Sequence, residues 1–322
     1  MKLSSSLKEL LEKAKNMEDY ELTLYDRIEV IKSVNEKNDL ESNAYLSFSG
    51  GKDSTILHYL LDLALPNNRI PRVFIDTGIE YNMIRDFVLN MAKKDDRIVI
   101  VRPSKPIKKV LEENGYPFKS KEHSLRVDQF NKGSNANYII KYVTGVDKNG
   151  KPTTFSCPNI LKYQFEERGK YNYSNLCCYK LKKEPVHKWE SENQKQVVIT
   201  GMRKEEGGNR SRLGCVITDK KGKLKKFHPL IVVSDDWEKW FVDKLERERE
   251  SRILCELYYE PYCFKRTGCK GCPFALELQE QLDTMAIYLP NERKQCEFIW
   301  KEVYDEYRRL GYRLKNKISI FD

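Results

Sequence analysis

The sequence predicts an α/β fold in which a parallel sheet is flanked by helices, with helical extensions at both ends. Apolar stretches of strand length alternate with stretches of helical periodicity along the first third of the chain, which is the order of βαβ units. Polar turns follow two of these predicted strands, SGGKDS after NAYLSF and DTG after PRVFI. In a parallel sheet such turns meet at the carboxyl edge, where ligands bind.

The elements of the first third follow in order. Residues 3–38 are of mixed charge and predict one or two helices, and NAYLSF alternates as a short buried strand should. The stretch DSTILHYLLDLAL has apolar residues at helical spacing and predicts the next helix. The pattern then predicts a strand at 71–78, a helix at 80–93, a strand at 97–103 and a short helix at 106–115.

The remaining elements are less regular. Residues 116–158 predict an irregular insertion or lid with a hairpin around DKNGKPTT. After it the pattern predicts helical structure at 159–192, a strand at 196–200, a hairpin at 215–230, a helix at 235–253 and helices at 283–314. We therefore expect three regions: an N-terminal helical extension (1–40), a central domain (41–275) and a C-terminal helical extension (276–322).

Composition narrows the class of protein. The chain is 40% hydrophobic and 33% charged, and it has no apolar run long enough to predict a membrane span. Its N-terminus lacks the apolar core of a signal peptide, so we expect a cytoplasmic protein. The 58 Lys and Arg exceed the 48 Asp and Glu, which suits a polyanionic partner such as nucleic acid. The predicted insertion contributes to this excess with Lys119, Lys121, Arg126, Lys132 and Lys141.

The turn SGGKDS has the chemistry of an anion site. A helix start offers unpaired N–H groups and the positive end of a dipole. Glycines allow the backbone to come close to an anion, hydroxyls donate to it, and Lys52 adds a full charge. We expect phosphate as the anion; the alternative is an ordinary glycine-rich turn.

Nine cysteines in a chain without an export signal indicate metal, redox or catalytic chemistry rather than disulfides. Cys177 and Cys178 are adjacent, and Cys269 and Cys272 form a CxxC in a glycine-rich turn. Four thiolates together would hold zinc or an iron–sulfur cluster, and sulfur ligation alone does not decide between them. The alternative for the adjacent pair is a buried, small apolar residue.

The six residues of SGGKDS resemble the PP-loop of the ATP pyrophosphatase superfamily, whose fold is the adenine nucleotide alpha hydrolase type. The resemblance implies that the loop holds the pyrophosphate part of ATP, with Mg²⁺, while a substrate atom attacks the α-phosphate. It implies catalytic roles for Lys52 and Asp53. The nucleotide-binding residues that it implies in this part of the chain are Ser47, Ser49, Gly50, Gly51, Lys52, Asp53 and Ser54.

Over residues 44–275 the chain also resembles the sulfonucleotide (APS/PAPS) reductase family. The shared order is the loop, DTG, CC, GxR and CxxC, as in the iron–sulfur branch of that family. The resemblance implies a [4Fe–4S] cluster, with zinc as the alternative, and places Lys182 near it. It implies four cluster ligands, Cys177, Cys178, Cys269 and Cys272, and five further nucleotide contacts, Asp76, Thr77, Gly78, Gly201 and Arg203.

Two departures from the reductases favour another reaction. Reductases carry a catalytic cysteine in a C-terminal Glu-Cys-Gly-Leu-His segment, whereas this sequence ends LGYRLKNKISIFD. Their loop usually lacks the lysine that is present here as Lys52. We therefore expect an ATP-dependent adenylating sulfurtransferase that uses a sulfur-donor protein and acts on nucleic acid or a small molecule. The alternatives are a reductase that uses Cys296 or a partner's thiol, and a non-catalytic, zinc-containing nucleotide-binding protein; Cys263 is a reserve ligand.

Overall fold

The computed structural model describes residues 19–265 and 267–315, which fold as two compact units built from alternating segments of the chain. The first unit takes its described residues from Met1–Ile75, Met83–Val101 and Lys188–Arg266. The second takes them from Asp76–Asn82, Arg102–His187 and Thr267–Asp322. The first part of the predicted N-terminal helical region, residues 3–18, lies outside the described residues.

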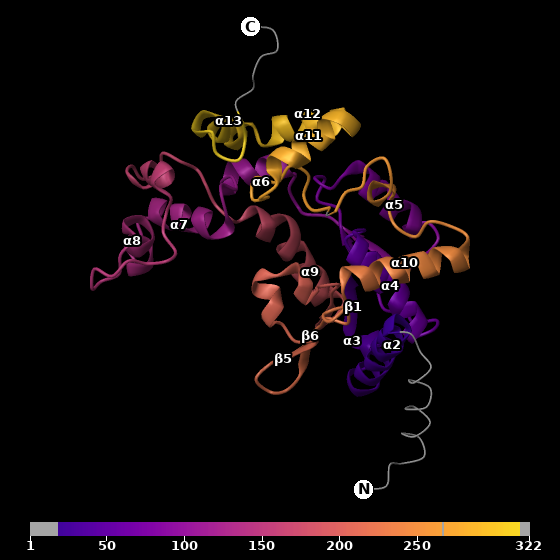
Figure 1. The fold of residues 1–322 in the computed structure, drawn as a ribbon. Coiled ribbons are helices and arrows are strands. Elements are labelled where there is room, and N and C mark those ends of the chain that lie inside the picture. Colours follow the sequence, from indigo (N-terminus) through magenta and orange to yellow (C-terminus); the bar gives the residue numbers. More distant parts are fainter. Residues whose placement is uncertain (1–18, 266, 316–322) are drawn as a thin grey trace. The chain divides into compact units, whose positions relative to one another are not determined.

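A six-stranded sheet in the order β3-β2-β1-β4-β6-β5 forms the centre of the first unit. All neighbouring strands are parallel except β5, which pairs with β6 as the antiparallel edge. Figure 1 shows β5 next to β6. The predicted α/β fold and the hairpin at 215–230 are therefore confirmed. The strands are β1 (Ala44–Ser47), β2 (Arg72–Ile75), β3 (Ile98–Val101), β4 (Val197–Ile199), β5 (Val216–Thr218) and β6 (Leu224–Phe227).

The strand order reverses between β1 and β4. On one side of β1 the chain adds β2 and then β3. On the other side β1 pairs with β4, and Leu46 lies opposite Ile199. The turns that follow β1 and β4 therefore lie side by side at the carboxyl edge. Such a reversal is where parallel sheets bind ligands.

Helices α2 and α10 of the first unit pack against α4 (Figure 1). Leu57, Leu60 and Leu61 of α4 are fully buried because they form the apolar face that the sequence pattern predicts. The helices that belong wholly or mainly to this unit are α2 (Asp19–Asn38), α3 (Leu40–Asn43), α4 (Lys52–Ala64), α5 (Asn82–Ala92), α9 (Glu184–Glu192) and α10 (Asp235–Arg249), with 3₁₀ turns at Lys204–Glu206, Gly208–Arg212 and Glu256–Tyr258.

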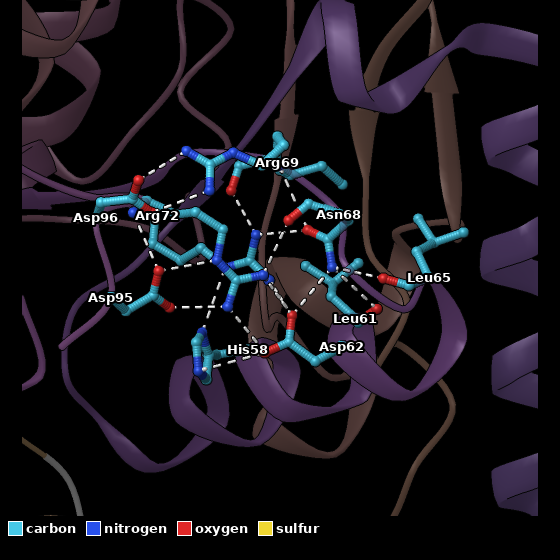
Figure 2. A network of polar contacts seen from close by, with 11 residues as sticks. His58, Leu61, Asp62, Leu65, Asn68, Arg69, Arg72, Asp95 and Asp96 are labelled. Carbon is cyan, nitrogen blue, oxygen red and sulfur yellow. Dashed lines mark hydrogen bonds and ion pairs between the residues drawn. The ribbon is translucent and has the colours of Figure 1, made fainter.

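A network of charged side chains closes the amino end of β2 (Figure 2). Arg72, the first residue of β2, is fully buried and donates to Asp62 at 2.7 Å, to Asn68 at 2.7 Å and to His58 Nδ1 at 3.2 Å. Arg97 donates to both oxygens of Asp62, at 2.7 and 3.0 Å. Each buried charge in this network therefore has an opposite charge or a hydrogen-bond partner.

The second unit is helical and has an aromatic core. Phe118 stacks on Tyr173 with 4.4 Å between ring centroids and contacts Tyr307 at 4.7 Å. Its last three helices, α11, α12 and α13, follow one another closely (Figure 1). Its helices are α6 (Ile107–Asn114), α7 (Lys121–Asn131), α8 (Asn137–Thr144), η1 (Asn159–Phe165), η2 (Tyr179–Lys183), α11 (Leu278–Tyr288), α12 (Pro290–Ile299) and α13 (Lys301–Leu310).

The prediction that residues 116–158 are irregular is wrong, because α7 and α8 lie there. The hairpin predicted around DKNGKPTT is reduced to a turn with one antiparallel bridge, Val146 to Pro152. The helical prediction for 159–192 holds only at the two ends of that range. No helix in the described part of the chain has the length and apolar character needed to cross a membrane.

Candidate functional site

The turn between β1 and α4 has a conformation that only glycine fits at one position. Ser47 ends β1, and two residues after Phe48 Gly50 has a φ of +69°. A Cβ on Gly50 would lie 2.5 Å from Cγ2 of Val88, so a side chain there would be both strained and in collision. The Ser49 N–H donates to Ser54 Oγ at 3.2 Å, and the two hydroxyl oxygens are 3.1 Å apart. The turn is thus held by its own hydroxyls.

In the part of the chain that the structure describes, no side chain caps the first turn of α4, whose N-cap residue is Gly51 in an extended conformation. The Ser54 and Thr55 hydroxyls donate to the Gly51 carbonyl oxygen at 2.9 and 3.0 Å, so both are hydrogen-bonded within the turn. An uncapped helix start of this kind offers N–H groups and a positive dipole end. This geometry suits an anion.

Lys52 lies in this first turn and is paired with acids from α10. Its Nζ is 2.6 Å from Glu238 Oε2 and 3.5 Å from Asp235 Oδ1. Burial lowers the pKa of Lys52, but the attraction of Glu238 and Asp53 outweighs burial, so the pKa is raised. Lys52 is therefore a stable cation beside the uncapped helix start.

The turn after β4 brings Gly201 and Arg203 to the same place. A Cβ on Gly201 would lie 2.9 Å from the Asp53 carbonyl oxygen, so glycine allows the two turns to touch. Arg203 is 5% exposed. Its guanidinium lies 3.1 Å from Glu238 Oε1, 2.7 Å from Asp235 and 3.6 Å from Asp53.

Glu238 completes this cluster, and the sequence analysis did not identify it. It is fully buried, and burial together with the neighbouring Asp53 carboxylate raises its pKa to about 8, against the pull of Lys52 and Arg203. Within the described residues, both Glu238 oxygens, Asp53 Oδ1 and Arg203 Nε lack a well-directed hydrogen bond. The only hint in the sequence is the acidic run DDWE at the start of a predicted helix, which does not show that one acid is buried. We call Lys52, Asp53, Arg203, Asp235 and Glu238 the open charge cluster.

Asp76, Thr77 and Gly78 belong to the second unit. The Asp76 carboxylate is nearly buried and lies 3.1 Å from Arg102 Nε. Thr77 donates to Glu80 through its N–H at 3.0 Å and its hydroxyl at 2.7 Å. Gly78 has a φ of +79° and open space where a Cβ would stand. Their predicted role in nucleotide binding remains a prediction.

The two cysteine pairs lie in the second unit and influence each other's ionisation. A hydrogen bond to Cys178, burial and the other thiolates raise the pKa of Cys177. The same hydrogen bond and three lysines (Lys121, Lys182 and Lys183) lower the pKa of Cys178 to about 6, against burial. Burial, Cys269 and Cys178 raise the pKa of Cys272 to about 12, and burial raises that of Cys269. The ionisation of each pair thus depends on the other pair, although the two pairs are distant in sequence.

The chemistry of these four thiols fits a zinc ion or an iron–sulfur cluster. Thiolates that raise one another's pKa repel when ionised, and a cation among them removes that repulsion. Among residues 19–265 and 267–315, no three His, Cys, Asp or Glu side chains stand as a ready metal-binding group. The role of Cys177, Cys178, Cys269 and Cys272 as ligands therefore remains a prediction.

Lys182 supplies positive charge beside the cysteines. It lies in η2, the π-helical turn that follows the adjacent cysteines, and such turns occur frequently at functional sites. The Cys269 thiolate, Glu80 and Cys178 raise the pKa of Lys182, although burial works against them. Glu80 is a second residue that the sequence analysis missed.

Cys296 is part of the core behind the CxxC turn. It is fully buried, and burial raises its pKa to about 12. A Cβ on Gly271, between the two CxxC cysteines, would lie 2.8 Å from Cys296 Sγ. Cys296 is thus a packed, protonated thiol at neutral pH, which argues against its use as a reductase nucleophile. Cys263, the reserve ligand, is exposed and lies in the first unit.

Comparison with known proteins gives one family. A family model described as the phosphoadenosine phosphosulfate reductase domain matches residues 43–147 and 154–275, which is more than half of the chain. An uncharacterized protein of Methanocaldococcus jannaschii is 40% identical over 73 residues. That segment is 23% of this chain and 17% of the relative, so the match spans less than a fifth of the relative's length.

Solved structures resemble the chain at low identity. A phosphoadenylyl-sulfate reductase from Candida auris, in a phosphate complex, is 15% identical with a TM-score of 0.43, over 84% of this chain and 97% of that one. An NH₃-dependent NAD synthetase from Campylobacter jejuni is 13% identical with a TM-score of 0.39, over 93% and 99%. A U34-tRNA thiolase from Methanococcus maripaludis with its [4Fe–4S] cluster is 14% identical with a TM-score of 0.36, over 93% and 82%.

Proposed function

The chain belongs to the phosphoadenosine phosphosulfate reductase domain family, and we propose that within it the chain is an ATP-dependent adenylating sulfurtransferase. In this proposal the turn from Ser49 to Ser54 binds the phosphates of Mg²⁺-bound ATP. An acceptor molecule is adenylylated there and then receives sulfur.

The observation that carries the proposal is the position of Lys52. It stands in the first turn of α4 beside uncapped N–H groups, with its ammonium group paired to a buried acid. A cation in this place can offset the charge that builds up on a departing pyrophosphate. An enzyme that binds a finished adenylyl sulfate forms no pyrophosphate, so Lys52 would have no such charge to offset. ATP cleavage therefore accounts for Lys52 better than sulfonucleotide reduction does.

The proposed reaction has two balanced steps. An acceptor oxygen attacks the α-phosphorus of ATP, the bond to the β-phosphate bridging oxygen breaks, and pyrophosphate leaves with Mg²⁺. A sulfur nucleophile at the oxidation level of sulfide then attacks the activated carbon, and AMP leaves with the acceptor oxygen. No electrons are transferred in either step. Arg203, with Lys52, would bind phosphate oxygens in the first step.

The four cysteines would hold a [4Fe–4S] cluster, or zinc in its place. When bound, the cluster would supply iron and sulfide for sulfur chemistry, whereas zinc would supply a structural crosslink. Lys182 would then offset part of the negative charge that four thiolates bring, since it already lies within the influence of Cys269 and Cys178. In this proposal the chain itself thus contributes Lys182 as the charge that balances the thiolates.

The net charge of the chain does not identify the acceptor, so we define the acceptor by the oxygen atom that it must carry. Three of the basic residues expected to face nucleic acid are engaged within the second unit. Lys119 donates to the Tyr142 hydroxyl at 3.1 Å, Lys132 to Asp128 at 2.8 Å, and Arg126 lies over the Tyr138 ring. The test therefore compares RNA, DNA and small molecules as acceptors, because each can carry an oxygen that ATP can adenylylate.

The test offers three nucleotides to protein purified without oxygen: Mg²⁺-bound ATP, adenylyl sulfate and its 3′-phosphorylated form. Total tRNA, DNA and a pool of small metabolites serve as acceptors in separate reactions. With sulfide added as the sulfur nucleophile, we expect ATP to bind and to release pyrophosphate and AMP in equal amounts when the right acceptor is present. Sulfite release from either sulfonucleotide with thioredoxin, without pyrophosphate release from ATP, would establish a reductase instead.

A further inference from the structure

The reaction proposed above assigns no role to Glu238, yet Glu238 lies between the two cations of the phosphate site. It is in the first turn of α10 and fully buried, and its two oxygens face different cations. Oε2 is 2.6 Å from Lys52 Nζ and Oε1 is 3.1 Å from Arg203 Nε. These are the two cations that the proposed function assigns to phosphate.

Charges from three segments face Glu238. From α4 come Lys52 and Asp53, from the turn after β4 comes Arg203, and Asp235 precedes Glu238 on α10 and contacts both cations. Glu205, in the 3₁₀ turn after Arg203, adds a fourth carboxylate, with Oε2 3.2 Å from Arg203 Nη1. With every acid ionised, two cations and four carboxylates carry two net negative charges, which oppose the entry of a polyphosphate.

The open charge cluster can accept phosphate only if the cations become free. A phosphate oxygen that contacts Lys52 and Arg203 takes the place of a Glu238 oxygen. A buried carboxylate that loses its counter-ions beside another carboxylate is costly, and such a group takes up a proton instead. Asp235 is half-exposed and remains solvated in the same event.

We propose that Glu238 is a proton-gated positioning residue of the phosphate site: when ionised it neutralises Lys52 and Arg203, and when protonated it releases both to the polyphosphate of the nucleotide. The inference rests on the proposed function only in that the turn from Ser49 to Ser54 binds a polyphosphate. When Glu238 starts ionised, nucleotide binding and proton uptake by Glu238 therefore occur together.

The expected size of the effect follows from the free protein. Burial and Asp53 raise the pKa of Glu238 to about 8, so below that pH the gate is open. The affinity should be flat near pH 7 and should fall about tenfold between pH 7 and pH 9, approaching tenfold per further unit. In the same range the number of protons taken up per bound nucleotide should rise from near zero toward one.

The experiment is isothermal titration calorimetry of the full chain with the α,β-methylene analogue of ATP and Mg²⁺, from pH 7 to pH 9.5. Each pH is measured in two buffers of different ionisation enthalpy, which counts the protons taken up. Inorganic pyrophosphate is the second probe. Glu238→Gln should bind with an affinity that does not change with pH and exceeds the native affinity about tenfold at pH 9.

Asp235→Asn is the matched control, because Asp235 contacts the same two cations from the same helix. Its side chain is 56% exposed, and Arg203 lowers its pKa, so it remains ionised throughout the range. This variant should bind somewhat more tightly at every pH and keep the native pH dependence and proton uptake.

The outcomes separate the two proposals. A native affinity without pH dependence, or a pH dependence that persists in Glu238→Gln, overturns the gate while ATP binding stands. A Glu238→Gln effect that follows Mg²⁺ concentration rather than pH also overturns it, because Glu238 would then bind the metal. The expected pH dependence without pyrophosphate release from ATP supports the gate and overturns adenylation. No binding of either probe overturns both.

Discussion

Two groups of buried charges lie at opposite ends of the same sheet. The group at the amino end of β2, centred on Arg72, is closed: its buried charges are paired and hydrogen-bonded, with Arg72 making four such contacts (Figure 2). The open charge cluster at the carboxyl ends of β1 and β4 has similar residues. Four of its buried atoms, on Asp53, Arg203 and Glu238, nevertheless lack a well-directed hydrogen bond within the described residues.

This difference in hydrogen bonding distinguishes a network that stabilises the fold from one that can still bind a ligand. Buried polar groups in native proteins are nearly always satisfied, and the exceptions call for an explanation. A closed network holds two segments of chain together, because removing one partner leaves the other charged and buried. An open network has capacity left for a ligand. In the closed network Arg97 donates to both oxygens of Asp95 at 2.8 Å, and the pKa of Asp95 is lowered. The pKa of Glu238 in the open charge cluster is raised instead.

The largest effect is expected in a third group, the four cysteines of the second unit, which extends the comparison. In the proposed function these thiols hold a metal, as the open charge cluster holds a ligand. Cys269→Ser should remove most of the iron or zinc from protein purified without oxygen. It should also lower the free energy of unfolding by more than about 4 kcal/mol, as loss of a metal does.

Metal analysis and chemical denaturation measure both changes for Cys269→Ser. Cys263→Ser is the control, because Cys263 is exposed; it should keep the native metal content. Equal metal content in both variants, or its absence from the native protein, would contradict the assignment of ligands.

The closed network is broken by Arg72→Met, which keeps the bulk of the side chain but not its charge. Asp62 and Asn68 would lose a donor each, so the free energy of unfolding should fall by about 3–5 kcal/mol. Arg69→Ala is the control, since Arg69 pairs with Asp96 on the exposed surface and should cost less than about 1 kcal/mol. Denaturation by urea distinguishes the two. A small loss for Arg72→Met would mean that the network contributes little.

The open charge cluster should respond in activity rather than in stability. Lys52→Ala should lower the rate of ATP cleavage by about 10²–10³-fold, the usual effect of removing one group that stabilises transition-state charge. Its melting temperature near pH 7 should change little, because the pKa of Glu238 is raised to about 8 and this acid is largely protonated at that pH. Pyrophosphate release and thermal unfolding measure the two effects. Cleavage at the native rate would exclude the catalytic role of Lys52.

The smallest effect is the pH dependence of stability that Glu238 contributes. Its folded-state pKa is raised from 4.5 to about 8, so its contribution is complete below about pH 4.5 and is lost as the pH rises through about 8. We expect the free energy of unfolding of Glu238→Gln to fall less than that of the native protein between pH 5 and pH 9. The difference should be on the order of 2 kcal/mol, part of the full linkage, because Lys52 and Arg203 relax. Parallel pH profiles for the two proteins would contradict the raised pKa.

The contrast also explains which residues could be predicted. The strand, turn and helix around SGGKDS follow from local periodicity and from glycine at a position with positive φ, and both are properties of neighbouring residues. Helix α7 was missed for the opposite reason. Its buried face holds His123 and Ser124 beside one apolar residue, Val127, and His123 is held by Tyr142 at 2.9 Å and Gln164 at 2.8 Å. These partners are distant in sequence, so no local pattern indicates them.

By itself the sequence determined the alternation of strands and helices, the glycine-rich turn between β1 and α4 and the presence of two cysteine pairs. These depend on periodicity, on backbone freedom and on residue type, which neighbouring residues carry. The tertiary structure alone decided that Glu238 is buried between Lys52 and Arg203, that Cys296 is a packed thiol, and that Arg72 is satisfied where Glu238 is not. Burial and charge pairing depend on segments that meet only after folding. An acid in a helix such as Glu238 is therefore a solvated surface group or a buried, proton-gated one according to the segments that pack against it.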